Sequence, residues 1–540
     1  MIQGGMVGAG VSALVAIGLS ERAGQAPAAS PVPGVALDPR GSPASKRESD
    51  ERAPPLDEGV WDVAAHDMNG DGLLDLVIAT GGPGSASGTV SVLLNPGSGA
   101  PASGWERISL GAPADYGRVA VGDIDGDGVN DVAALTFSTH VLRWWLLDAD
   151  HRVRDERSMS FAGAQLPGRQ CEAPGPLTAT PPTLASLAFA DLDVDHALEL
   201  GVAGYVGRAE GALYLFSFEP RTGCFELHRG FAQATRGSLK LRFFDVDDDG
   251  ALDIVTSHYA LARPTTPREG CSDCVEWGEW WPTERARAPV PLLARLGNRA
   301  LRAADPVPEL NVVDFDVTRA EGGALFALAG SAHLCPASDC WSEGHAGFVS
   351  VVDQSGGELW SSDGWKAEVE QTPPVADARL LPRAVSFGGP LGQPALFAGY
   401  WWGTRRKDSA CSRVSACAGP LTSVTLNSHH TAPAVVESGS FVQALAFSGR
   451  ARGPLKQHCE AQPRRLVDLP EVPLGVVGFR SNGRALPASA HSWVSGSNVV
   501  ALSAAVAQER GPFCIDYATS ARPELAVADS KHGLRLIPLH

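Results

Sequence analysis

The sequence has too little positive charge, and too few long apolar runs, for several common classes of protein. Lys and Arg number 44 against 61 Asp and Glu, which gives a formal net charge of −17. A nucleic-acid partner is therefore not expected, because phosphate binding requires a basic surface. Outside the N-terminus, no run approaches the roughly 18 apolar residues of a membrane-spanning helix, so the mature chain is expected to be soluble and to lack a membrane span.

The composition also lacks the regularity of fibrous chains and the polarity of disordered ones. The 60 Gly and 40 Pro residues follow no Gly-X-Y period, which excludes collagen, and a hydrophobic content of 44% excludes wholesale disorder. Abundant Gly and Pro without such a period are typical of a protein with many turns. The composition thus favours a turn-rich all-β fold.

The N-terminal region predicts a targeting segment followed by a linker. Val7–Leu19 is an apolar run too short for a membrane span, and the Ala-Pro-Ala at 26–28 matches the small residues before a cleavage site. Residues 1–28 are expected to be a secretory signal peptide; because no Lys or Arg precedes the apolar run, a small-residue tail or a misplaced start codon is the alternative. Residues 29–57, rich in Pro, Ser and charge, predict a linker. The mature protein would then be extracellular or on the cell surface.

The ten cysteines form an even number, which in a secreted chain indicates disulfides. A zinc half-site or a redox motif is the alternative for the first close pair, but no second Cys pair or His pair follows it at ligand spacing. Four cysteines cannot be paired from the sequence: Cys171, Cys224, Cys459 and Cys514. Three close pairs predict local disulfides within single loops: Cys271–Cys274, Cys335–Cys340 and Cys411–Cys417.

A repeated pattern of apolar strand, acidic turn and second apolar strand is the strongest signal in the chain. Four copies read VAAHDMNGDGLLDLVIAT, VAVGDIDGDGVNDVAALT, LAFADLDVDHALELGVAG and LRFFDVDDDGALDIVTSH. Their acidic turns lie about 55 to 70 residues apart, which leaves room for four strands in each unit, as in a β-propeller blade. Weaker copies begin at Leu310, Ala384 and Cys514, and another near Phe441. In the first unit the predicted strands are 60–66, 75–80, 89–95 and 105–110.

The acidic turns have the oxygen spacing of a calcium loop. In the first, second and fourth units, side-chain oxygens stand at positions 1, 3, 5 and 9 and a glycine follows position 5, a pattern of hard oxygen ligands that suits Ca²⁺. An EF-hand is not expected, because position 12 holds no Glu and strands flank the turn. The alternative is a metal-free turn whose Asp, Asn and Gly serve geometry alone, although such crowded carboxylates would repel one another. The predicted ligands are Asp67, Asn69, Asp71 and Asp75, then Asp123, Asp125, Asp127 and Asp131, then Asp245, Asp247, Asp249 and Asp253.

The third unit is a weaker candidate for the same chemistry. It keeps Asp191, Asp193, Asp195 and Glu199, but His196 replaces the glycine that would tighten the turn. Three calcium ions are therefore expected, with a fourth in this unit as the alternative.

With these loops the chain resembles the FG-GAP/VCBS repeats of the integrin-α-type β-propeller. The resemblance rests on the DxDGDG-type loops and extends, more weakly after about residue 320, over residues 58–540. It implies four-stranded blades around one axis, with calcium between the first and second strands, and members commonly have seven blades. A single all-β propeller of seven blades is predicted, with eight as the alternative. Blades are expected near 58–112, 117–161, 183–230, 238–305, 309–363, 382–438 and 440–540, the last stretch holding one or two.

Long loops are expected on the face opposite the calcium loops, because connections alternate between the two ends of a meandering sheet. These loops carry the close cysteine pairs and many aromatic residues, and rigid aromatic loops suit carbohydrate stacking and protein recognition. The alternative is that the rings pack the loops onto the blades. The pair Trp144-Trp145 lies in a predicted outer strand and is expected to pack between blades. The candidate ligand residues are Tyr205, His258, Trp277, Trp280, Trp281, Trp341, Tyr400, Trp401 and Trp402.

The expected function is that of a secreted, monomeric, calcium-stabilised binding or adhesion module for an extracellular glycan or protein. Catalysis is the alternative, as a calcium-dependent polysaccharide lyase or related enzyme with His258 and Tyr259 as candidate base and acid. Motifs such as GxSxG and HExxH do not occur in a usable context. The fold alone cannot decide between the two, because one fold hosts many functions.

Overall fold

The computed structural model describes residues 56–538 apart from internal gaps, and nearly all of its regular structure is β-strand. The predicted signal peptide and almost all of the linker lie outside the described residues. The longer gaps are 98–103, 263–273, 283–288, 296–308, 334–344, 362–378, 389–394, 404–417, 426–433, 470–474, 487–490 and 494–498. The shorter ones are 57, 83, 165–167, 193–194, 196, 207–209, 321–322, 441, 450–451, 521–522 and 531–532.

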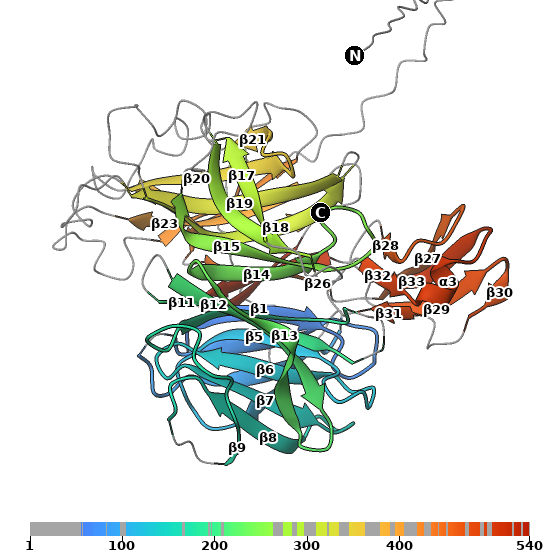
Figure 1. Ribbon diagram of the computed structural model, residues 1–540, viewed down its shortest axis with the longest axis horizontal. Helices are drawn as coiled ribbons and strands as arrows, with labels where there is room; N and C mark the ends of the chain where they lie inside the picture. Colours follow the sequence, from blue (N-terminus) through green and yellow to red (C-terminus); the bar gives the residue numbers. More distant parts are fainter. Residues whose placement is uncertain are drawn as a thin grey trace, which may run out of the picture. The chain divides into compact units, whose positions relative to one another are not determined.

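Each of the first three sheets contains an antiparallel meander of four strands (Figure 1). The first contains β1 (Val60–His66), β2 (Asp75–Thr80), β3 (Val90–Leu94) and β4 (Glu106–Leu110), which confirms the four strands predicted for this unit. The second contains β5 (Tyr116–Gly122), β6 (Asp131–Thr136), β7 (Val141–Leu147), β8 (Val153–Ser160) and β9 (Arg169–Cys171), the last parallel to β8. The third contains β10 (Thr183–Ala190), β11 (Glu199–Val206), β12 (Glu210–Glu219) and β13 (Cys224–Thr235).

The next three sheets repeat the same four-stranded order. The fourth contains β14 (Ser238–Phe244), β15 (Asp253–Ala262), β16 (Cys274–Trp281) and β17 (Val290–Arg295). The fifth contains β18 (Glu309–Ala320), β19 (Gly323–His333), β20 (His345–Asp353) and β21 (Glu358–Ser361). The sixth contains β22 (Arg379–Gly388), β23 (Ala395–Gly403), β24 (Ala418–Thr425) and β25 (Ala434–Ser440).

The seventh sheet is split by a long insertion. Its strands are β26 (Val442–Gly449), β34 (Pro523–Asp529) and β35 (Gly533–Pro538). The residues between β26 and β34, here called the inserted unit (residues 452–520), form two small sheets and the helix α3 (Ala504–Ala507). One sheet contains β27 (Arg452–Glu460), β33 (Phe513–Ser520), β29 (Gly475–Ser481) and β30 (Arg484–Ala485); the other contains β28 (Leu466–Asp468), β32 (Val499–Leu502) and β31 (His491–Trp493).

The stretch 440–540 therefore differs from the one or two ordinary blades expected there. The sequence copies near Phe441 and Cys514 contain, respectively, the first and second strands of one sheet, β26 and β34. The inserted unit stands where the other sheets have a short loop between these strands. Because both strands carry the apolar pattern, the sequence alone suggested two separate copies.

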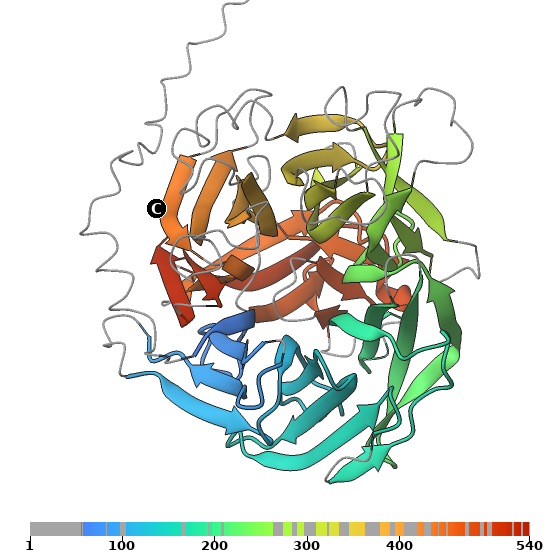
Figure 2. The same ribbon diagram turned by 90° about the vertical axis from the view of Figure 1, so that its left-hand side faces the viewer.

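The first strands of the seven sheets contact one another in a closed order. β1 contacts β5, β5 contacts β10, and the chain of contacts continues through β14, β18 and β22 to β26, which in turn contacts β1. Figure 2 shows these sheets following one another in chain order around a common centre. Four-stranded antiparallel sheets joined through their first strands are the architecture of a β-propeller.

Large apolar side chains fill the spaces between neighbouring sheets. Successive residues of a strand point to opposite faces, so the adjacent Trp144 and Trp145 of β7 enter different interfaces. Trp144 belongs to the core cluster shared with the third sheet, and Trp145 to the cluster shared with the first. Both side chains are fully buried, which confirms the prediction that this pair packs between blades.

Candidate metal centre

The acidic loops occupy the same place in the first, second and fourth sheets, between the first and second strands. Position 9 of each loop is the first residue of the second strand: Asp75 of β2, Asp131 of β6 and Asp253 of β15. The strand register pairs Asp131 with Gly122, the residue immediately before position 1. The antiparallel hairpin therefore brings positions 1 and 9 together across the loop.

Hydrogen bonds to the position-1 carboxylate fold the loop tightly. Asp123 accepts hydrogen bonds from the backbone N–H groups of Gly126, Asp127 and Gly128, at 2.8, 3.0 and 2.8 Å. Gly126 and Gly128 have φ angles of 77° and 86°, a left-handed conformation that glycine adopts without strain. Asp67 is held in the same way by Gly70 and Gly72.

The position-9 carboxylate is buried and anchored to the backbone on both sides. Asp131 accepts from the N–H of Ile124 at 2.9 Å and from that of Leu147 at 2.8 Å. Asp75 accepts equivalent bonds from Met68 and Asn95. Each carboxylate oxygen has two lone pairs, so these bonds leave capacity for a cation.

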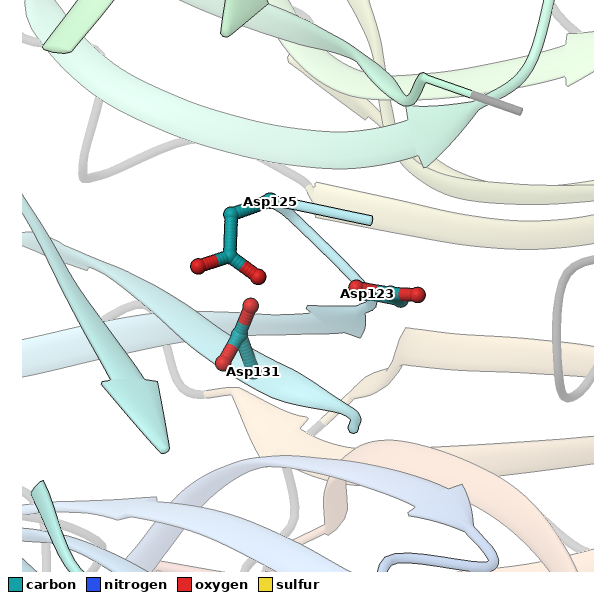
Figure 3. Close-up of side chains that lie close together, drawn as sticks. All are labelled: Asp123, Asp125 and Asp131. Carbon is teal, nitrogen blue, oxygen red and sulfur yellow. The ribbon is translucent and has the colours of Figure 1, made fainter. Parts of the chain in front are cut away.

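Three carboxylates converge in the second sheet, as Figure 3 shows. Asp123, Asp125 and Asp131 each offer an oxygen within 4.8 Å of the others, and Asp245, Asp247 and Asp253 form an equivalent group in the fourth sheet. Within the described residues, Asp125 Oδ1 is buried and has no hydrogen-bond partner. A buried oxygen without a partner is energetically costly. The loop therefore has both the geometry of a cation site and a buried oxygen that a cation could coordinate.

The acidity of these groups gives a second test of the fit. Burial raises the pKa of Asp75 to about 7 and that of Asp131 and Asp253 to about 8, and neighbouring carboxylates add to the effect. Burial also raises the pKa of Asp245 to about 6. A divalent cation would favour the charged form of every one of these groups. The oxygen-only donor set and the clustered negative charge therefore fit Ca²⁺.

The third sheet retains part of the same arrangement. Asp191 and Glu199 are buried, and Glu199 opens β11 and accepts from the backbone N–H of Leu192 at 2.9 Å, as the position-9 Asp does elsewhere. The N–H of the exposed Asp195 donates to Asp191 at 3.2 Å. Asp193 and His196 lie outside the described residues.

Comparison with known proteins finds a repeat family in the N-terminal part of the chain. Residues 67–134, which span the first two acidic loops, match the family model of the FG-GAP-like repeat. The likeness to an FG-GAP-like repeat is shown for these residues. No curated protein sequence matches the chain. Among the residues that the structure describes, no helix is long and apolar enough to cross a membrane.

Solved structures similar to this chain include two proteins named Sqt1 and one described as the Dos1 propeller. Sqt1 of Saccharomyces cerevisiae is 9% identical, over 91% of this chain and 100% of that one, with a TM-score of 0.42. Sqt1 of Chaetomium thermophilum is 10% identical, over 91% and 99%, with a TM-score of 0.39. The Dos1 propeller is 8% identical, over 85% and 78%, with a TM-score of 0.37. These likenesses carry no information on function.

Two arginines that the sequence did not single out contact the acidic loops. Arg154 of β8 forms ion pairs with Asp125 and Asp127, the latter at 3.0 Å. Arg319 of β18 donates to the backbone carbonyl of Asp245 at 2.7 Å. Both come from strands remote in sequence from the loop they contact, and no spacing pattern could have linked them.

The aromatic candidates are placed differently from the expectation. Trp277, Trp280 and Trp281 lie in strand β16, not in a loop, and their rings are buried. Trp277 is 1% exposed, and the centroid of its ring lies 5.4 Å from the ring centroid of Phe315 and 5.3 Å from that of Phe326, both in the fifth sheet. The prediction of a loop position is wrong for these three because their rings pack between blades: Trp277 and Trp280 against the fifth sheet, and Trp281 against the third.

The other candidates on this face are also strand residues where the structure describes them. Tyr400 in β23 and His258 in β15 are buried, and Tyr205 in β11 is half-buried. Trp401 and Trp402 lie in β23 and Tyr259 in β15, but their side chains are not described. Trp341 lies outside the described residues.

Two disulfides pair the four cysteines whose partners the sequence left open. Cys171–Cys224 joins β9 of the second sheet to β13 of the third, and Cys459–Cys514 joins β27 to β33 within the inserted unit. Of the three close pairs, Cys271, Cys335, Cys340, Cys411 and Cys417 lie outside the described residues.

Proposed function

We propose that the protein is a secreted, monomeric seven-bladed propeller, stabilised by calcium, that binds an extracellular glycan or protein. The closed order of contacts among seven first strands supports the blade count. The two disulfides suit an oxidising compartment outside the cell. The observation that carries the proposal is the convergence of three carboxylates around an unpartnered buried oxygen in the second sheet.

Calcium would serve the fold in this proposal. The residues that would hold it are those at positions 1, 3, 5 and 9 of the loops beginning at Asp67, Asp123 and Asp245, with a fourth site at Asp191. The bound cation would neutralise the carboxylates and fix the hairpin between the first two strands of a blade.

Ligand binding is assigned to the face opposite the acidic loops. Trp401 and Trp402 near the end of β23, and Trp341, are the first positions to test there. Trp277, Trp280 and Trp281 are less suited to contact a ligand because their rings are buried between blades. Burial argues in the same way against catalysis by His258, since a general base must reach its substrate.

The test is binding of the mature chain to an immobilised panel of glycans, in calcium and in EDTA. Selective binding that requires calcium, and that is lost in Trp401→Ala or Trp402→Ala but kept in Trp277→Phe, is the expected result. A blank panel would refute a glycan ligand and leave a protein ligand. Formation of unsaturated oligosaccharide products would instead support the lyase.

A further inference from the structure

A cleft of about 680 Å³ lies between β8, β9 and the turn that joins β12 to β13. Four arginines line it: Arg154, Arg157, Arg169 and Arg221. Neither the acidic loops' predicted role in calcium binding nor the proposed ligand face requires such a concentration of guanidinium groups.

The walls of the cleft are fixed by covalent and polar contacts. Asp155 pairs with Arg157 at 2.7 Å and with Arg169 at 3.6 Å. The Arg157 guanidinium lies against Gly223, where an added Cβ would come within 3.0 Å of it. The neighbouring disulfide Cys171–Cys224 joins β9 to β13 across the cleft wall. Arg157 and the strands that form the cleft are therefore held in position before any ligand arrives, which lowers the entropy cost of binding.

The acidic side chains that line the cleft do not occupy all of the guanidinium N–H donors, so some of these donors are available to bind a ligand. Glu156 pairs with Arg143 at 3.5 Å, and Asp155 is shared by two arginines. Within the described part of the chain, the Arg221 side chain has no partner, and the Arg169 side chain is 70% exposed. Guanidinium groups bind planar or tetrahedral oxyanions through paired N–H donors.

Arg154 connects this cleft to the acidic loop of the second sheet. Its guanidinium lines the cleft and also pairs with Asp125 and Asp127, two predicted calcium ligands. A cation in the loop would satisfy these carboxylates and weaken their hold on Arg154. The guanidinium would then be free to join the other three.

We propose that the cleft binds an oxyanion, a carboxylate, sulfate or phosphate group, and that its affinity rises when calcium fills the loop of the second sheet. The linkage is reciprocal, so the anion also raises the calcium affinity of that loop. The linkage rests on the proposed calcium site, whereas the anion site itself does not.

The test uses the full chain and radiolabelled inorganic sulfate in equilibrium dialysis, with calcium or with EDTA at equal ionic strength. Sulfate affinity is expected to be about fivefold or more higher in calcium. The double variant Arg169→Ala/Arg221→Ala is expected to lose about tenfold or more in sulfate affinity in both conditions. Arg152→Ala, an exposed neighbour outside the cleft lining, is the matched control and keeps wild-type behaviour.

Calorimetric calcium titrations in sulfate and in chloride provide the second readout. Arg154→Ala is expected to raise calcium affinity in chloride and to abolish the effect of sulfate on it. Displacement of bound sulfate by glucuronate or by phosphate distinguishes a carboxylate ligand from a phosphorylated one.

Three results would count against these assignments. Equal sulfate binding by the wild type and the double variant would overturn the anion site. Equal sulfate binding in calcium and in EDTA would overturn the linkage. A chain that binds sulfate in an Arg169- and Arg221-dependent way but binds no calcium would refute the proposed calcium function and confirm the anion site alone.

Discussion

At the scale of single residues, the buried carboxylates make stability depend on pH and on metal together. The pKa values of Asp131 and Asp253 are about 8 in the folded protein, against 3.8 for an ordinary Asp. Between these values the folded protein binds more protons than the unfolded one, so the free energy of unfolding decreases as pH rises. In EDTA, the melting temperature should therefore fall from about pH 5 to about pH 8.

Calcium is the control for this pH dependence. Because the cation replaces the proton on these carboxyls, the decrease in melting temperature with pH should be smaller in calcium than in EDTA. For the same reason, calcium affinity should increase over this pH range. Scanning calorimetry at several pH values measures both effects. A melting temperature in EDTA that rises over this range would contradict the assignment of these groups.

The buried Trp277 separates packing from recognition. Replacing it with Ala removes a ring packed against Phe315 and Phe326 and should cost about 3–5 kcal/mol of stability. Urea unfolding measures that loss. Trp277→Phe, which retains most of the packing, should bind glycans as the wild type does; lost binding at unchanged stability would show that this ring contacts the ligand.

At the scale of elements, the inserted unit should be separable from the sheet that it interrupts. Gly449 at the end of β26 is paired with Pro523 at the start of β34, so a short Asn-Gly turn can replace residues 450–522. The shortened chain is expected to fold and to keep its calcium-dependent melting. Its melting temperature should be lower, since Ala518 of the inserted unit packs in the core cluster that contains Val63 of β1.

Circular dichroism and calcium-dependent thermal melting check this deletion. The control is a chain shortened at the turn between β6 and β7, which carries no insertion. It measures the effect of shortening a loop without removing the inserted unit. If the shortened chain stays unfolded in calcium, the inserted unit is required for the seventh sheet to form.

The strands could be predicted from the sequence where two strands adjacent in the chain also pair with each other in the sheet. Each acidic turn joins two strands that pair directly, so β1 and β2 were predicted to the residue. The seventh sheet was missed because its pairing strands are separated by an insertion with no repeat pattern. The arginines at the loops were missed for a related reason, since Arg154 reaches Asp125 only after the sheet has folded.

At the scale of the whole molecule, calcium should stabilise the closed ring of sheets. A ligand that binds only the folded chain adds stability by mass action, about 2.7 kcal/mol per site at a concentration a hundred times its dissociation constant. EDTA should therefore lower the melting temperature, and added calcium should restore it. An unchanged melting temperature after verified removal of metal would refute the calcium sites.

The separation of β26 from β34 also sets a delay in the folding of the nascent chain. β26 contacts β1 and β22, yet its own sheet partner emerges only after residues 450–522 have been made. At a synthesis rate of about 5–20 residues per second, this delay is roughly 4–15 s. During that time the first six sheets are complete, but the seventh sheet, which lies between β1 and β22, lacks β34 and β35. The inserted unit therefore has time to fold before the ring of sheets closes.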